Sequence, residues 1–181
     1  MQLKFESYIK DQFPYLLEEK CVVCCSGGVD SIVLFYLMLS LHKNFVVAHC
    51  NFKLRDEESD DDEEFVKNIC KQNSIEFYSK SFETKKIKEK SNNSIQMIAR
   101  DLRYEFFEEL SSLLDIKHIL TAHHLNDSLE SFLINMSRGS GLDGLTGVPE
   151  LNGKIKRPLI EFEKKDIIDF ALNNNLSWRE D

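Results

Sequence analysis

The segment with the clearest chemical potential is Ser26-Gly27-Gly28-Val29-Asp30-Ser31. Small apolar residues precede it at 21–25, and an apolar run follows at 32–39, so the pattern predicts a buried strand that turns sharply into a helix. Such a junction presents backbone N–H groups and the positive end of a helix dipole, which together favour phosphate. No Lys follows the glycines where a Walker A loop requires one. We therefore predict a phosphate-binding loop of another type; the alternative is a tight turn that binds nothing.

Three acidic residues are candidates for catalysis. Asp30 lies inside the loop, where a carboxylate repels phosphate unless Mg²⁺ lies between them. Asp127 and Glu130 are three residues apart on a predicted helix and share one face, which points away from the core. An apolar stripe that includes Leu129 and Leu133 is expected to face the core. The acidic pair could hold a metal or grip an ammonium group, but acids in a first helical turn also simply complement the dipole. We take all three as candidate catalytic residues, and Asp30 and Asp127 as candidate Mg²⁺ ligands.

Basic and imidazole side chains complete the candidate site. Arg100 and Arg103 lie on one flank of a long predicted helix, and Arg138 ends the next helix. The planar guanidinium suits phosphate, although a single Arg is more often solvated. His49 and His123 each close a predicted strand. We take Arg100 and Arg138 as candidate catalytic residues. The candidate nucleotide-binding residues are Ser26, Gly27, Gly28, Val29, Asp30, Ser31, His49 and His123.

Predicted strands and helices alternate along the chain. The strands are expected at 20–25, 45–50, 75–82 and 118–122, and a final strand at 176–178 is left open. The helices are expected at 3–13, 31–42, 59–73, from 95 with Ser94 as N-cap, 126–137 and 166–174. Strands that are apolar on both faces predict an α/β fold with a doubly wound, mostly parallel sheet of about five strands flanked by helices. Ligands bind beyond the carboxyl ends of such strands, where the candidate residues should meet.

Composition narrows the class of protein. With 181 residues, 42% hydrophobic and 30% charged, the chain is most simply one globular domain. A net charge of −8 argues against a surface that grips nucleic acid by charge alone, and we read the acidic run at 56–64 as a solvated approach to a helix. The first residues lack the apolar core of a signal peptide, and no apolar run is long enough for a bilayer, so no membrane partner is expected.

The five cysteines indicate a reducing compartment. Their number is odd and three of them crowd one predicted strand, which argues against a disulfide framework and favours the cytoplasm. Cys21 and Cys24 should face opposite sides of their strand, because side chains alternate along it. We therefore expect them to be core residues and not ligands of one metal.

The glycine-containing loop resembles the pyrophosphate loop (PP-loop) of the N-type ATP pyrophosphatases, which split ATP between its α and β phosphates. Further segments extend the likeness, and together they resemble the tRNA(Ile)-lysidine synthetase family. The matching segments, in family order, are 26–31, 48–55, 99–104, 122–131, 138–145, 157–159 and 178–181. The resemblance implies an adenine-nucleotide α-hydrolase-like fold that uses ATP and Mg²⁺. It implies adenylylation of the C2 oxygen of the wobble cytidine in the CAU anticodon of tRNA(Ile), followed by displacement of AMP by free L-lysine.

The resemblance also assigns roles. It implies that the loop binds the ATP phosphates with Asp30 acting through Mg²⁺, that Asp127 and Glu130 serve the metal or the lysine, and that Arg100 and Arg138 face the substrate. Three residues depart from the family: Phe52 stands where many members have His, Asn126 where many have an acid, and Ser131 where the family has Thr. Members usually continue past 178–181 into domains that grip tRNA. This sequence stops there, so we expect 1–181 to be the PP-loop catalytic domain without them.

Two other functions stay open. A thiolase-type PP-loop enzyme that modifies tRNA would need exposed cysteines, whereas most cysteines here lie in predicted strands. A fragment that binds nucleotide without turnover is the second alternative. Dependence of AMP release on lysine or on a sulfur donor would separate the two enzymes.

Overall fold

A six-stranded sheet forms the centre of the computed structural model, which describes residues 1–42, 44–55, 57–137 and 148–180. The strand order is β3-β2-β1-β4-β6-β5. The strands are β1 (Cys21–Cys24), β2 (Phe45–Asn51), β3 (Glu76–Ser81), β4 (His118–Leu120), β5 (Leu151–Asn152) and β6 (Ile155–Lys156). The first five in spatial order are parallel, and β5 pairs antiparallel with β6. The predicted mostly parallel sheet is confirmed.

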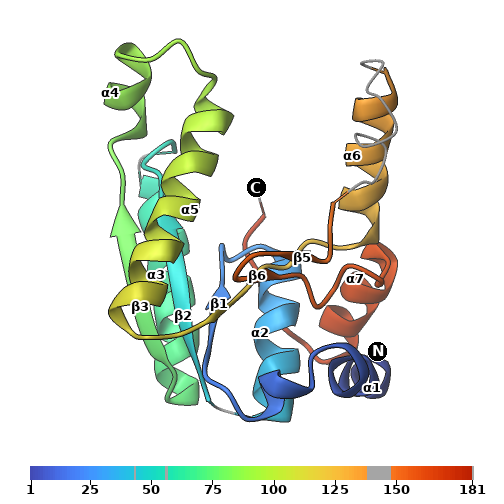
Figure 1. Ribbon diagram of the computed structural model, residues 1–181. Coiled ribbons are helices and arrows are strands. Elements are labelled where there is room, and N and C mark those ends of the chain that lie inside the picture. Colours follow the sequence, from blue (N-terminus) through green and yellow to red (C-terminus); the bar gives the residue numbers. More distant parts are fainter. Residues whose placement is uncertain (43, 56, 138–147, 181) are drawn as a thin grey trace.

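Helices cover both faces of this sheet (Figure 1). The helices on one face are α1 (Gln2–Gln12), α2 (Val29–Leu41), α3 (Glu57–Asn73) and α7 (Lys164–Asn173). On the other face, α5 (Ile95–Leu113) packs Phe106 and Phe107 against the sheet. Cys21 belongs to the core of the first face and Cys24 to that of the second, as their spacing predicts. The fold is therefore doubly wound.

The order of the strands reverses beside β1. From β1 the chain crosses over to β2 and then β3 on one side, whereas β4 and β6 lie on the other side. In open parallel sheets a crevice forms at this switch point, beyond the carboxyl ends of the strands. The loop at 25–28, between β1 and α2, lies at this crevice.

One helix differs from its expected packing. We expected the apolar stripe of α6 (Leu125–Ser137) to face the core, but this helix contains no buried residue. Leu129 and Met136 are more than half exposed, and α6 rises away from the sheet as a separate arm (Figure 1). The upper part of α5, with α4 (Thr84–Glu89), forms a second arm. The apolar stripe therefore predicted the helix correctly, but the expectation that its apolar side chains are buried was wrong.

The remaining differences lie in short elements. No strand forms at 176–178; instead the N–H of Arg179 donates to the carbonyl of Gly27 at 2.9 Å, so this segment runs along the loop at 25–28. The 3₁₀ turn η1 (Pro14–Leu17), α4, β5 and β6 were not predicted, because two to six residues are too few to display a period. No helix within the described ranges has the length and apolar content needed to cross a membrane.

Candidate functional site

The phosphate loop is organised around the hydroxyl of Ser31. Its Oγ accepts the N–H groups of Ser26 and Gly27, each at 3.2 Å, and donates to the carbonyl of Gly28 at 2.9 Å. Gly27 has φ +102°, a conformation that side-chain-bearing residues rarely adopt. Gly28 is the N-cap of α2 and supplies no side-chain cap, so the first N–H groups of the helix face outward from its end. This end of α2 is suited to an anion.

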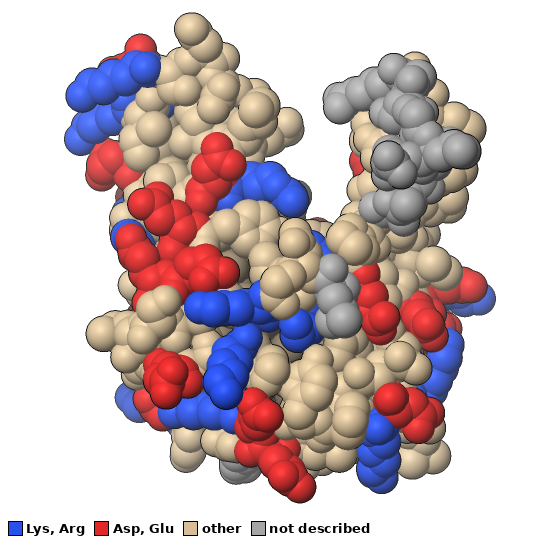
Figure 2. All heavy atoms as spheres, in the orientation of Figure 1, with Lys and Arg blue, Asp and Glu red and all other residues tan. Residues whose placement is uncertain are grey.

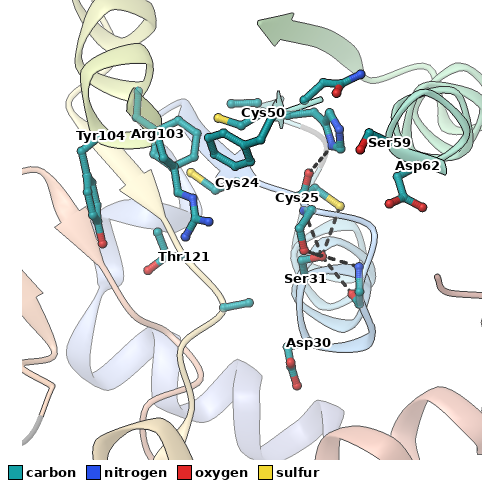
Figure 3. Close-up of a pocket in the computed structure, with 18 of the residues that line it drawn as sticks. Cys24, Cys25, Asp30, Ser31, Cys50, Ser59, Asp62, Arg103, Tyr104 and Thr121 are labelled. Atoms are coloured by element: carbon teal, nitrogen blue, oxygen red, sulfur yellow. Dashed lines mark hydrogen bonds between the residues drawn. The ribbon is translucent and has the colours of Figure 1, made fainter. Parts of the chain in front are cut away.

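A cavity of about 630 Å³ opens beside the loop, within the size range of small-molecule sites (Figure 3). Its lining comes from the ends of β1, β2 and β4, from α3 and α5, and from the start of α6. Of the six predicted loop residues, four line it: Ser26, Gly28, Asp30 and Ser31. Gly27 faces Val66 and Arg179 behind the loop. The predicted convergence at the carboxyl ends of the strands is therefore present.

The two predicted histidines both line the cavity and are neutral at pH 7. Burial lowers the pKa of His49, whose Nδ1 lies 2.9 Å from the carbonyl oxygen of Cys25 and ties β2 to the start of the loop. Burial, with the nearby Arg157 guanidinium, lowers the pKa of His123 to about 4. Its Nδ1 lies 2.9 Å from the hydroxyl of Thr121. Neutral imidazoles can exchange hydrogen bonds with a nucleotide without adding charge.

The predicted acids are placed differently from one another. Asp30 and Asp127 line the cavity, and Nε2 of His124 lies 3.5 Å from Oδ1 of Asp30 and 3.6 Å from Oδ2 of Asp127. Asp127 also accepts the N–H of His124 at 2.8 Å, the dipole-complementing contact that its position at a helix start allows. Glu130 is exposed on α6, outside the cavity lining. The structure thus brings together two of the three.

The donor set fits a magnesium ion that a nucleotide carries, not a complete protein cage. No group of three or more His, Cys, Asp or Glu side chains among the described residues could hold a metal. Mg²⁺ in nucleotide sites commonly takes one or two carboxylates and completes its shell with phosphates and water. Asp30 and Asp127 could supply those carboxylates. Both oxygens of Asp30, however, already accept from Nζ of Lys164, at 2.6 and 2.7 Å.

Arg103 is the arginine of α5 that lines the cavity, not Arg100. Its guanidinium lies 5.5 Å from the centre of the Phe52 ring, and Figure 3 shows it on the far side of the cavity from Asp30. Arg100 is exposed and stacks on Tyr104 at 5.0 Å. Arg138 and the glycine-rich segment that begins there lie outside the described residues. The three-residue spacing in the sequence indicated a shared flank, but not which arginine points inward.

The cavity wall beyond β2 is held by side chains to which the sequence analysis assigned no role. Asn51, 2% exposed, donates to Asp60 at 2.8 Å and to Glu63 at 2.9 Å. Asp62 accepts from Arg55 at 2.9 Å and from Arg179 at 2.8 Å. We expected the acidic run at 56–64 to be a solvated approach to a helix, and most of its described acids are exposed at the start of α3. Three of them, Asp60, Asp62 and Glu63, also anchor the segment that bears Phe52 and Arg55. The spacing of acids at a helix start does not indicate which distant side chains they contact.

Basic side chains gather below the hollow between the two arms (Figure 2). Acidic side chains lie on the flank beside them in the same view. The net charge of −8 therefore coexists with a local positive region at the mouth of the sheet.

Comparison with known families decides the class of the domain. The PP-loop domain profile matches residues 1–181, the whole chain. The chain belongs to the PP-loop domain family. The loop around Ser31 is accordingly its PP-loop, and the family uses ATP.

Two curated relatives of this PP-loop domain are tRNA(Ile)-lysidine synthases. A tRNA(Ile)-lysidine synthase of Chlorobaculum tepidum is 39% identical over 164 residues, which are 88% of this chain and 50% of that protein. A tRNA(Ile)-lysidine synthase of Bacteroides thetaiotaomicron is 37% identical over 170 residues, 94% of this chain and 40% of that protein. The chain thus spans half or less of the length of these relatives.

Solved structures share the fold of this PP-loop domain. The U34-tRNA thiolase NcsA of Methanococcus maripaludis superposes with a TM-score of 0.78 at 18% identity, over 99% of this chain and 66% of that one. An NH3-dependent NAD synthetase of Campylobacter jejuni gives 0.61 at 15% identity, over 95% and 74%. At such identities the likeness concerns the fold alone.

Proposed function

We propose that this PP-loop domain is the catalytic part of a tRNA(Ile)-lysidine synthetase and acts in the cytoplasm. The observation that carries the proposal is a phosphate loop and two carboxylates around one cavity, in a chain 34–39% identical to proteins of that name. In the first step the C2 oxygen of the wobble cytidine attacks the α phosphorus of ATP, and pyrophosphate leaves. In the second step the amine of free L-lysine attacks C2, and AMP leaves as the amine loses a proton.

The geometry supports the first step at both ends of the cavity. The start of α2 and the hydroxyl of Ser26 offer donors to phosphate oxygens, while the hydroxyl of Ser31 holds the loop in shape. At the other end Phe52, Tyr104 and Arg103 present flat groups on which a nucleobase can stack. Holding the acceptor oxygen in line with the phosphorus would supply much of the rate enhancement. Asp30 and Asp127 would hold Mg²⁺, which would neutralise charge on the phosphates.

The second step needs lysine with a neutral amine. We assign Glu130 to holding the ammonium and taking its proton, a role that Asp127 could share only where it does not bind Mg²⁺. Glu130 lies one turn beyond Asp127 on α6, outside the cavity, so it would meet a ligand only at the mouth. Arg100 and Arg138 stay candidates for contact with the tRNA.

The thiolase alternative is disfavoured by the state of the thiols. Cys24, Cys25 and Cys50 line the cavity, but burial raises the pKa of Cys25 to about 11 and that of Cys50 to about 12. A thiol held protonated at neutral pH is a poor nucleophile and a poor ligand. A sulfur-transfer site would need the opposite environment.

The deciding experiment measures AMP and pyrophosphate released by the full-length protein. We expect release to require tRNA(Ile) with a CAU anticodon and to be completed by free lysine, with lysine appearing in the tRNA. A persulfide donor in place of lysine should not support AMP release. Release that depends on the sulfur donor and ignores lysine would establish the thiolase alternative instead.

A further inference from the structure

Lys164 forms the most direct charge contact of the phosphate loop. It is the first residue of α7, and its Nζ lies 2.6 Å and 2.7 Å from the two carboxylate oxygens of Asp30. The side chains of Lys164 and Asp30 are 35% and 29% exposed, so the pair is only partly solvated, and Asp30 lines the cavity. The ammonium therefore occupies both oxygens that a divalent cation would use.

The backbone of Lys164 is fixed from the start of α6. Its N–H donates to Oδ1 of Asn126 at 2.9 Å, and the neighbouring N–H of Leu125 donates to the carbonyl of Phe162 at 3.0 Å. These bonds hold the first turn of α7 against the first turn of α6. The four-carbon stem of the lysine remains free to rotate, so its ammonium can change partner without any movement of the helix.

Within the described ranges, two charged or ionisable side chains form ion pairs with Asp30. Besides Lys164, Nε2 of His124 lies 3.5 Å from Oδ1, and the same nitrogen lies 3.6 Å from Asp127. A metal ion that arrives alone must displace an ammonium that already satisfies Asp30. A metal–nucleotide complex instead brings anionic oxygens, which are strong partners for the displaced ammonium.

We propose that Lys164 is an exchangeable counter-ion of Asp30. Without nucleotide its ammonium neutralises the carboxylate; when a magnesium–nucleotide complex binds, the ammonium moves to a phosphate oxygen and frees Asp30 for the cation. The nucleotide half rests on the proposed function, whereas the competition with a bare cation does not. It follows that metal and nucleotide enter together.

The test removes the charge of Lys164 and measures two ligands separately. Mn²⁺ alone is titrated by electron paramagnetic resonance of the free ion, and α,β-methylene ATP with Mg²⁺ is titrated by calorimetry. For Lys164→Gln we expect Mn²⁺ alone to bind about tenfold more tightly and the magnesium–nucleotide complex about tenfold more weakly, the scale of one charge-assisted contact. Lys165→Gln, which removes the same charge from the next, exposed residue, should behave as wild type. Lys164→Arg should retain most of the nucleotide affinity.

The outcomes test separately whether Lys164 competes with a bare cation and whether its ammonium moves to a phosphate oxygen. Unchanged Mn²⁺ affinity in Lys164→Gln would overturn the competition, and unchanged nucleotide affinity would overturn the transfer to phosphate. If Lys165→Gln changed both affinities as much as Lys164→Gln does, the effect would come from net charge alone, and both parts of the proposal would be overturned. Failure of the wild-type protein to bind the magnesium–nucleotide complex would overturn the proposed function and the transfer, while the Mn²⁺ titration would still decide the competition.

Discussion

Ser31 gathers the PP-loop around a single hydroxyl. Its Oγ accepts two backbone N–H groups and donates to one carbonyl, so the loop is held in shape before any ligand arrives. A preformed loop spares the ligand the cost of ordering it. A Ser two residues into a helix is common, and nothing in the sequence shows that its hydroxyl points back into the loop.

Replacement of Ser31 by alanine tests this organisation. Ser31→Ala leaves the N–H groups of Ser26 and Gly27 without their acceptor, so we expect magnesium–ATP affinity to fall about tenfold or more and the free energy of unfolding to fall by about 1–2 kcal/mol. Calorimetry and chemical denaturation measure the two effects. The matched control is Ser40→Ala on the same helix, whose hydroxyl donates to the carbonyl of Leu37 far from the loop. Equal nucleotide affinity in both variants would contradict the role of Ser31.

The buried imidazoles predict how stability depends on pH. His123 has a pKa of about 4 in the folded state and about 6.5 when unfolded, so below pH 6.5 the unfolded chain takes up the proton. The free energy of unfolding should therefore fall as the pH drops from about 7 to about 4, by about 2–3 kcal/mol from this residue, with His49 adding in the same direction. Denaturation series at several pH values measure this slope. His123→Gln should flatten it, and a slope that the substitution leaves unchanged would contradict the assignment.

At the scale of single residues, the sequence predicted part of the cavity lining but not how the charges pair. Asp30, Asp127, His49 and His123 line the cavity as expected. Lys164 was missed because it lies 134 residues from its partner Asp30, and no local pattern connects them. Arg103 was not preferred over Arg100, since helical spacing gives a shared flank and not the rotation of the helix against the sheet.

Elements with a long, regular pattern were predicted well. The helix from 95 begins at Ser94, whose side chain accepts the N–H of Met97 at 3.2 Å, as expected of an N-cap. The apolar strands were found within a residue or two at most ends. By contrast, β5 and β6 have two residues each, and the environment of α6 depends on how far that helix projects from the sheet, which periodicity does not encode.

The segment after α7 and the helix α3 jointly support the PP-loop. Asp62, 9% exposed, receives one hydrogen bond from Arg55 and one from Arg179, and the N–H of Arg179 donates to Gly27. Asp62→Ala would leave two guanidinium groups without this shared acceptor. We expect the free energy of unfolding to fall by about 1–2 kcal/mol, discounted because both arginines are partly exposed, and nucleotide affinity to fall with it.

The neighbouring acid provides the control for this element. Asp61 is 71% exposed and lies 3.8 Å from Arg179, so Asp61→Ala should change the free energy of unfolding by no more than about 0.5 kcal/mol. Thermal and chemical denaturation of the two variants under the same conditions measure the difference. Equal losses would mean that Asp62 acts only through its charge.

The charge of the whole chain predicts weak binding to tRNA. A net charge of −8 opposes the approach of a polyanion, although basic groups gather at the mouth of the sheet (Figure 2). We expect residues 1–181 to bind tRNA with a dissociation constant of about 10 µM or higher at physiological salt. The affinity should fall as the salt concentration rises. Filter binding over a salt series measures both. Nanomolar binding by this chain would require a recognition surface that its charge does not predict.

The reversal of strand order beside β1 has a consequence for cooperativity. One wall of the cavity belongs to the crossovers through β2 and α3, and the other to α5, β4 and α6. A ligand bound between these walls contacts both halves of the chain and links them non-covalently. Ligand binding should therefore slow amide hydrogen exchange in both halves of the sheet, including at residues far from the reacting atoms.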